Sequence, residues 1–215
     1  MRYEELYLRM HDGTASSSIP AWAGRVLSEV ATGATPISAV RHPLGFLCLP
    51  IERTGRLGVC LHLWSPDVAP LATTSQIHCH SWDLVSHVLY GRLRNITTRT
   101  GEGRDLRVFE VLSRGDTDEL RATPRTVKAV SGETATHGPG EVYSLPAGVF
   151  HSTLLDAGPN AATVALGVES PIGRDLSLGT LDLRSHQVRR MRCGPAETAR
   201  AAHRAAALLA AEVAS

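Results

Sequence analysis

The chain has 215 residues, enough for one domain with a sizeable core, and its formal net charge of +1 comes from charged residues spread along its length. Acidic and basic residues are nearly equal in number and mixed along the chain, so the sequence lacks the basic patch that is typical of a nucleic-acid-binding protein. We therefore expect no nucleic-acid partner. The four cysteines are too few for a disulfide framework, and no C-x-x-C pair indicates structural zinc. We therefore expect reduced thiols in a cytoplasmic protein.

Residues 1–44 are predicted to form an N-terminal helical extension. The segment is charged from its second residue and has no apolar stretch of signal-peptide length, so secretion is not expected. Ser18 and Pro20 are typical of a helix start, and apolar residues then recur at helical spacing until Gly33.

Residues 45–190 are predicted to form an all-β domain. Short apolar runs are separated here by turn residues, which is typical of a β-sandwich or barrel. The runs at 92–99 and 106–112 predict two separate strands. Those at 151–157 and 161–168, which a Gly-Pro-Asn sequence separates, predict two more.

Residues 191–215 are predicted to form a C-terminal helix that Pro195 opens. The segment is rich in alanine, but charged residues interrupt it well short of the roughly 20 apolar residues that a membrane span requires. We therefore expect no membrane partner. The helix is expected to pack on the β-domain or to contact a second subunit, so a homodimer is one expectation.

The stretch IHCHSWDLVSHVLYG, residues 77–91, contains two histidines one residue apart. Alternate side chains of a strand point to the same face, so His78 and His80 can aim at one point while Cys79 points to the other face. In a chain with ten histidines, such a pair can also arise by chance. The pair becomes a metal-site hypothesis only if a third ligand lies elsewhere.

The third histidine follows a second motif, GPGEVYSLPAGVFH, in which Pro146 and Gly148 predict a tight turn before His151. The chain resembles the cupin superfamily, whose motifs are G-x5-H-x-H-x3,4-E-x6-G and G-x5-P-x-G-x2-H-x3-N. The matching positions are His78, His80 and Gly91 in the first motif, and Gly140, Pro146, Gly148 and His151 in the second. The resemblance implies a cupin jelly-roll barrel over residues 45–190 and a metal held by His78, His80 and His151.

Leu84 stands where the first cupin motif has its glutamate, and an apolar side chain cannot bind a metal. Ala72 and Leu155 also replace a glycine and an asparagine of the motifs. Asp83 is an alternative fourth ligand if the turn after His80 is one residue tighter. His87 has the opposite strand parity and is expected to face away from the metal unless a bulge shifts the register.

Three neutral imidazoles leave a divalent cation with its full charge and with open coordination positions, which favours a small anionic substrate. Similar ligand sets in cupins imply thiol, diketone-cleaving or ring-cleaving dioxygenases that use ferrous iron and O₂. Fe(II) is thus the favoured cofactor by resemblance, with Zn, Mn, Ni and Cu as alternatives. The alternative functions are a non-redox decarboxylase, isomerase or lyase, and a small-molecule-binding module.

Three residues are candidates for substrate binding. Arg56 and His62 share one face of the hairpin at 52–64, and an arginine can grip both oxygens of a carboxylate. Tyr90 has the strand parity of Leu84 and is expected to point inward. The alternatives are that Arg56 is a solvated hairpin arginine and that Tyr90 belongs to the core.

Overall fold

The computed structural model describes residues 1–170 and 173–214, which form three helices and an eleven-stranded sheet. Ser215, the last residue of the predicted C-terminal helix, lies outside the described residues. The helices are α1 (Tyr3–His11), α2 (Ala15–Thr32) and α3 (Pro195–Val213). No helix among the described residues is long and apolar enough to cross a membrane.

The N-terminal helices agree with the prediction except at the start of α2. Gly33 ends the helix with a left-handed φ of 74°, as its position predicts. The start was predicted at Ser18, but α2 begins at Ala15 and Pro20 lies inside it. The Ser17 hydroxyl donates a hydrogen bond of 2.7 Å to the carbonyl of Thr14, which stabilises this additional first turn.

The strands fill most of the chain between α2 and α3. They are β1 (Val40–His42), β2 (Phe46–Thr54), β3 (Leu57–Trp64), β4 (His78–Cys79), β5 (Trp82–Arg114), β6 (Thr117–His137), β7 (Val142–Leu145), β8 (His151–Glu169), β9 (Leu176–Gly179), β10 (His186–Arg189) and β11 (Met191–Arg192). β1 and β11 fall within the segments 1–44 and 191–215, which were predicted to be helical.

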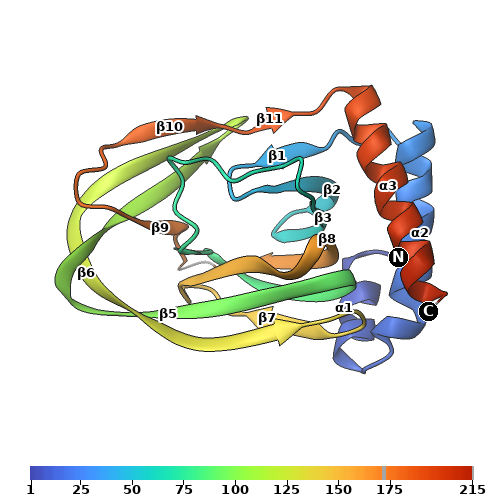
Figure 1. Ribbon diagram of the computed structural model, residues 1–215, viewed down its shortest axis with the longest axis horizontal. Helices are drawn as coiled ribbons and strands as arrows, with labels where there is room; N and C mark the ends of the chain where they lie inside the picture. The colour runs from blue at the N-terminus through green and yellow to red at the C-terminus, as the bar shows by residue number, and fades with distance from the viewer. Residues whose placement is uncertain (171–172, 215) are drawn as a thin grey trace.

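The strands pair in the order β10-β6-β5-β9-β4-β8-β3-β2-β1-β11, with β7 paired to β5 and a further pairing of β5 with β8. The chain is thus mostly β, as predicted, but a closed barrel stays a prediction. Figure 1 shows β5 and β6 curving around the end of the molecule that lies opposite the helices.

Two predicted strand breaks are wrong, because β5 and β8 each continue through them. β5 keeps pairing with β6 beyond Gly101 by means of register shifts, and β8 continues through Gly158, whose φ is 73°. Bulges and glycines let a strand bend and still remain in the sheet, so turn residues in the sequence do not require a chain reversal.

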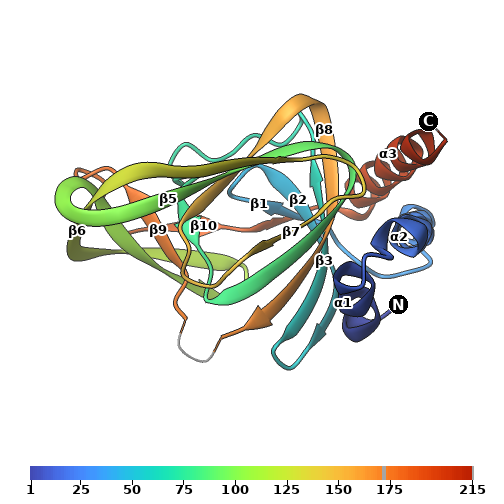
Figure 2. The same cartoon turned by 90° about the horizontal axis from the view of Figure 1, so that it is seen from below.

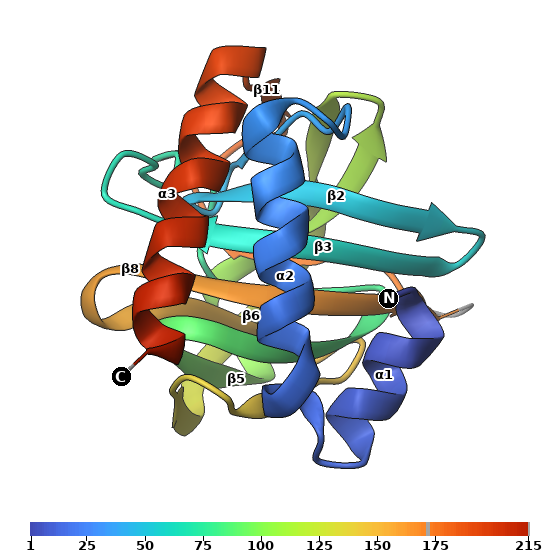
Figure 3. The same ribbon diagram turned by 90° about the vertical axis from the view of Figure 1, so that its right-hand side faces the viewer.

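The helices cover one face of the sheet and leave the other face for the interior. Figure 3 shows α2 and α3 side by side across β2, β3 and β8, and Figure 2 shows α1 and α2 on the same side. The core beneath them contains Leu27, Leu61 and Leu166, each fully buried. Leu61 and Leu166 are strand residues, and since strand side chains alternate, their neighbours along the strand point to the opposite, interior face.

Candidate metal centre

His78, His80 and His151 come together because β4 pairs with the start of β8. His78 lies directly opposite His151 in this antiparallel pair, and His80 follows two residues after His78. Their ring centroids are separated by 4.5 Å (His78 to His151), 4.7 Å (His78 to His80) and 5.1 Å (His80 to His151). One nitrogen from each ring lies within 4.8 Å of the others. The convergence predicted from strand parity is therefore present.

The turn before His151 is hydrogen-bonded directly to His80. The backbone N–H of Gly148, which has a left-handed φ of 77°, donates a hydrogen bond of 2.9 Å to the carbonyl of His80. The Asp83 carboxylate accepts a hydrogen bond of 2.8 Å from the backbone N–H of Ala147. Asp83 is exposed and holds this turn from outside, so the hypothesis that it is a fourth ligand is wrong.

Two of the three rings are oriented by backbone carbonyls. His78 Nδ1 lies 2.9 Å from the carbonyl oxygen of Gln76, and His151 Nδ1 lies 2.9 Å from that of Val149. A ring that donates from Nδ1 presents the lone pair of Nε2 to a metal. These two carbonyls therefore select the tautomer that a metal ligand requires.

Burial keeps the three imidazoles neutral. It lowers the pKa of His78 to about 3, with a further contribution from the charge of His151. Burial also lowers the pKa of His80 and of His151. Neutral imidazole is the form that binds a cation, so this donor set fits a divalent metal such as Fe, Zn, Ni or Cu at neutral pH.

The position of the missing glutamate faces the same cavity as the histidines. Leu84 lines this cavity and packs against Tyr143 and Val88. His87 is fully buried on the other face, where burial lowers its pKa to about 4, so it is not a ligand. Both of its ring nitrogens lack a hydrogen-bond partner among the described residues.

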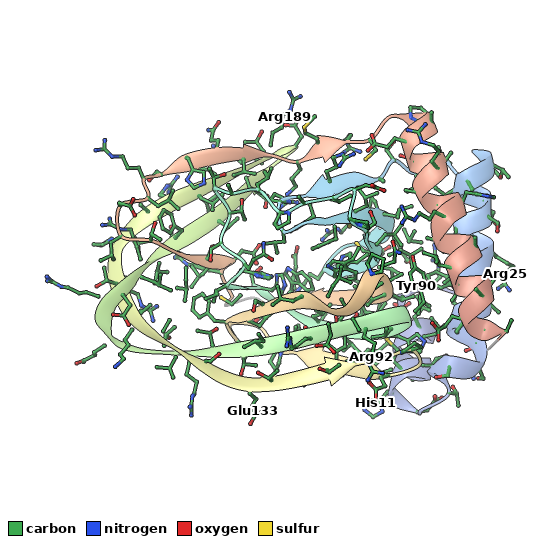
Figure 4. All side chains as sticks on the ribbon, in the orientation of Figure 1. His11, Arg25, Tyr90, Arg92, Glu133 and Arg189 are labelled. Atoms are coloured by element: carbon green, nitrogen blue, oxygen red, sulfur yellow. The ribbon has the colours of Figure 1, made fainter. Side chains whose placement is uncertain are left out.

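The histidines line a cavity of about 380 Å³, which is the size of a small-molecule site. Of the predicted substrate residues, Arg56 and His62 line this cavity. Tyr90 does not. It packs in the core beneath the helices, as Figure 4 shows, and lines a different cavity beside α3.

Tyr90 fails the parity argument because of a bulge. The pairing of β5 with β8 shifts between Val88 and Tyr90, so one additional residue turns Tyr90 toward Ala162 on the helix side. Gly91 follows with a φ of 75°, and a Cβ there would lie 2.2 Å from the carbonyl oxygen of Asn160. The glycine of the first motif therefore allows the strand to turn at this point.

The charged residues of the cavity balance one another. Three arginines and three acidic residues line it: Arg53, Arg56, Arg190, Asp118, Glu169 and Asp175. Arg190 donates to both carboxylate oxygens of Asp118 at 2.6 Å, and Arg56 donates to the carbonyl of Glu169. Sequence reasoning missed Arg190, because only the pairing of β10 with β6 brings it near the histidines.

No protein-family model and no curated protein sequence matches the chain. A cupin superfamily protein from Desulfitobacterium hafniense DCB-2 matches 58% of this chain and 78% of its own, with 8% identity and a TM-score of 0.33. A cupin-like protein from Thermotoga maritima MSB8 matches 63% of this chain and 77% of its own, with 12% identity and a TM-score of 0.32. The chemistry of the site therefore follows from the chain's own three histidines.

Proposed function

We propose that this chain is a metal-dependent cupin enzyme, a non-haem Fe(II) dioxygenase that acts on a small anionic substrate. The observation that carries this proposal is the convergence of three imidazoles on one point of a cavity, with no fourth protein ligand among the described residues. A structural metal ion is usually coordinated by four protein ligands, whereas a catalytic metal ion keeps at least one coordination position open for water or substrate. The open positions would accept the substrate and O₂.

The balance of charges in the cavity supports an anionic substrate. Because Arg190 is paired with Asp118, its charge is already neutralised. A divalent ion on three neutral imidazoles would therefore be the largest uncompensated charge in the cavity, and it would attract an anion. Arg53, which is 70% exposed and lies 4.0 Å from Glu169, stands at the rim and can contact a carboxylate that reaches the solvent.

The protein's own contribution would be to position the substrate and to exclude water. The indole of Trp82 stacks on His80, with ring centroids 4.1 Å apart, and Leu84 and Tyr143 add apolar surface. Ferrous iron, when bound, would supply the O₂ chemistry. The apolar wall would protect the reacting atoms from bulk water and would strengthen electrostatic contacts inside the cavity.

Oxygen uptake tests the proposal. The protein is loaded with Fe²⁺ without air and is then given O₂ together with a panel of small thiols, diketones and phenolic acids. We expect O₂ consumption only when a substrate is present, no activity with Zn²⁺, and loss of activity in His151→Ala. His87→Leu is the matched control, since His87 is buried on the other face. Turnover by the zinc protein without O₂ would instead support the non-redox decarboxylase, isomerase or lyase.

A further inference from the structure

A second group of metal-binding side chains lies in the same cavity. Cys48, Cys60 and His62 each contribute one ligand atom, and these atoms lie within 4.8 Å of one another. All three side chains are partly buried and line the cavity. Nothing in the proposed reaction uses the two thiols.

The pairing of β2 with β3 builds this group. Cys48 lies directly opposite His62, and Cys60 lies two residues before His62 on the same face of β3. The ligand atoms of the three side chains therefore gather on one face of the hairpin, within 4.8 Å of one another. The group is fixed by the part of the hairpin that pairs without a shift, from Leu47 with Leu63 to Pro50 with Cys60; the register shifts directly after Pro50.

The surroundings of His62 hold its ring in place. Phe46 and Trp64 contact it, with ring centroids at 4.6 Å and 5.8 Å. Thr163 lies directly opposite His62 on β8 and is fully buried. Its hydroxyl has no hydrogen-bond partner among the described residues.

The arrangement favours a metal over a disulfide. Cys48 and Cys60 are diagonal neighbours across the ladder, a relation in which the residues lie about 7–8 Å apart, whereas the Cα atoms of a disulfide usually lie about 4.4–6.8 Å apart. A tetrahedral zinc ion with Zn–S bonds of about 2.3 Å needs its sulfur ligands about 3.8 Å apart. Ligand atoms within 4.8 Å can reach that spacing by shifts of about 1 Å.

We propose that Cys48, Cys60 and His62 form a second metal site, for a thiophilic divalent ion such as Zn²⁺. Thiolate and imidazole are the ligands that zinc prefers, and two thiolates neutralise the charge of the ion in a partly buried place. The three protein ligands leave a fourth position, which faces the cavity. This site does not depend on the metal at the three-histidine centre.

Cobalt titration of the reduced protein without air tests the proposal, because Co²⁺ bound to thiolate gives an intense near-ultraviolet absorption. We expect this absorption in the parent and its loss in the Cys48→Ser/Cys60→Ser double variant. Cys193→Ser, which removes a buried thiol outside the group, is the matched control and should keep it. His151→Ala should also keep it, which separates this site from the proposed dioxygenase centre.

A second measurement uses the parent protein alone. Zn²⁺ should protect Cys48 and Cys60 from an alkylating reagent at least tenfold, as peptide mass mapping would show. Equal alkylation rates with and without Zn²⁺, or a reduced parent that binds Co²⁺ without thiolate absorption, would overturn the proposal. A disulfide between Cys48 and Cys60 that re-forms at once after reduction would overturn it as well.

Discussion

Replacing His151 with alanine tests the metal centre most directly, because His151 lies opposite His78 and completes the ligand set. A ligand of the native state at one hundred times its Kd adds about 2.7 kcal/mol to the free energy of unfolding. Loss of even an outer partner of a metal ligand costs about 10–100-fold in affinity. Loss of a ligand itself should lower the affinity for the metal at least about 100-fold. The same metal concentration would then add only about 0.4 kcal/mol to the free energy of unfolding of His151→Ala.

Urea unfolding with and without Fe²⁺ in the absence of air measures this difference. All proteins carry Cys48→Ser and Cys60→Ser, so that metal binding by these two thiols does not contribute. His151→Ala also loses the hydrogen bond to the Val149 carbonyl, worth about 1 kcal/mol, but this loss is equal with and without metal and cancels. His87→Leu, the matched control, should keep the full 2.7 kcal/mol expected, to within about 0.5 kcal/mol. If His151→Ala gains as much from Fe²⁺ as the parent, the three-histidine site is wrong.

Three further predictions follow from other positions. Burial lowers the pKa of His87 from 6.5 to about 4 in the folded state. As the pH drops from 6.5 to 4, His87 is protonated in the unfolded state but not in the folded state, so the free energy of unfolding falls over this range. The share of His87 in this loss is about 3 kcal/mol, and the total loss should be smaller by that amount in His87→Leu, as urea unfolding against pH would show. Leu84→Glu should keep or raise the affinity for the metal and lower the affinity for an anionic substrate, because the new carboxylate can bind the metal from the same cavity. Titration calorimetry measures both affinities. Metal binding weaker than that of the parent would contradict the prediction. Gly91→Ala should destabilise the protein by at least about 2 kcal/mol more than Gly55→Ala, because both glycines have positive φ but only Gly91 would bring a Cβ against backbone. Equal costs in urea would refute the steric argument.

The sequence by itself determined the parts of the site that depend on local geometry. The alternation of a strand places His78 and His80 on one face whatever they pair with, and a proline and glycine before His151 predict the turn that delivers it. Gly33 ended α2 for a similarly local reason. The mostly β character of the chain followed from its short apolar runs, which do not depend on tertiary contacts.

Only the tertiary structure decided the features that depend on register and pairing. A single additional residue in the bulge near Gly91 turned Tyr90 from the cavity to the helix side, because strand parity reverses at a bulge. Cys48 joins Cys60 and His62 through the register of the β2–β3 hairpin, and Arg190 reaches the cavity because β10 pairs with β6, a strand far from it along the chain. Local preferences set which face a side chain occupies within a strand, but the partner across the ladder is chosen by the packing of the whole sheet.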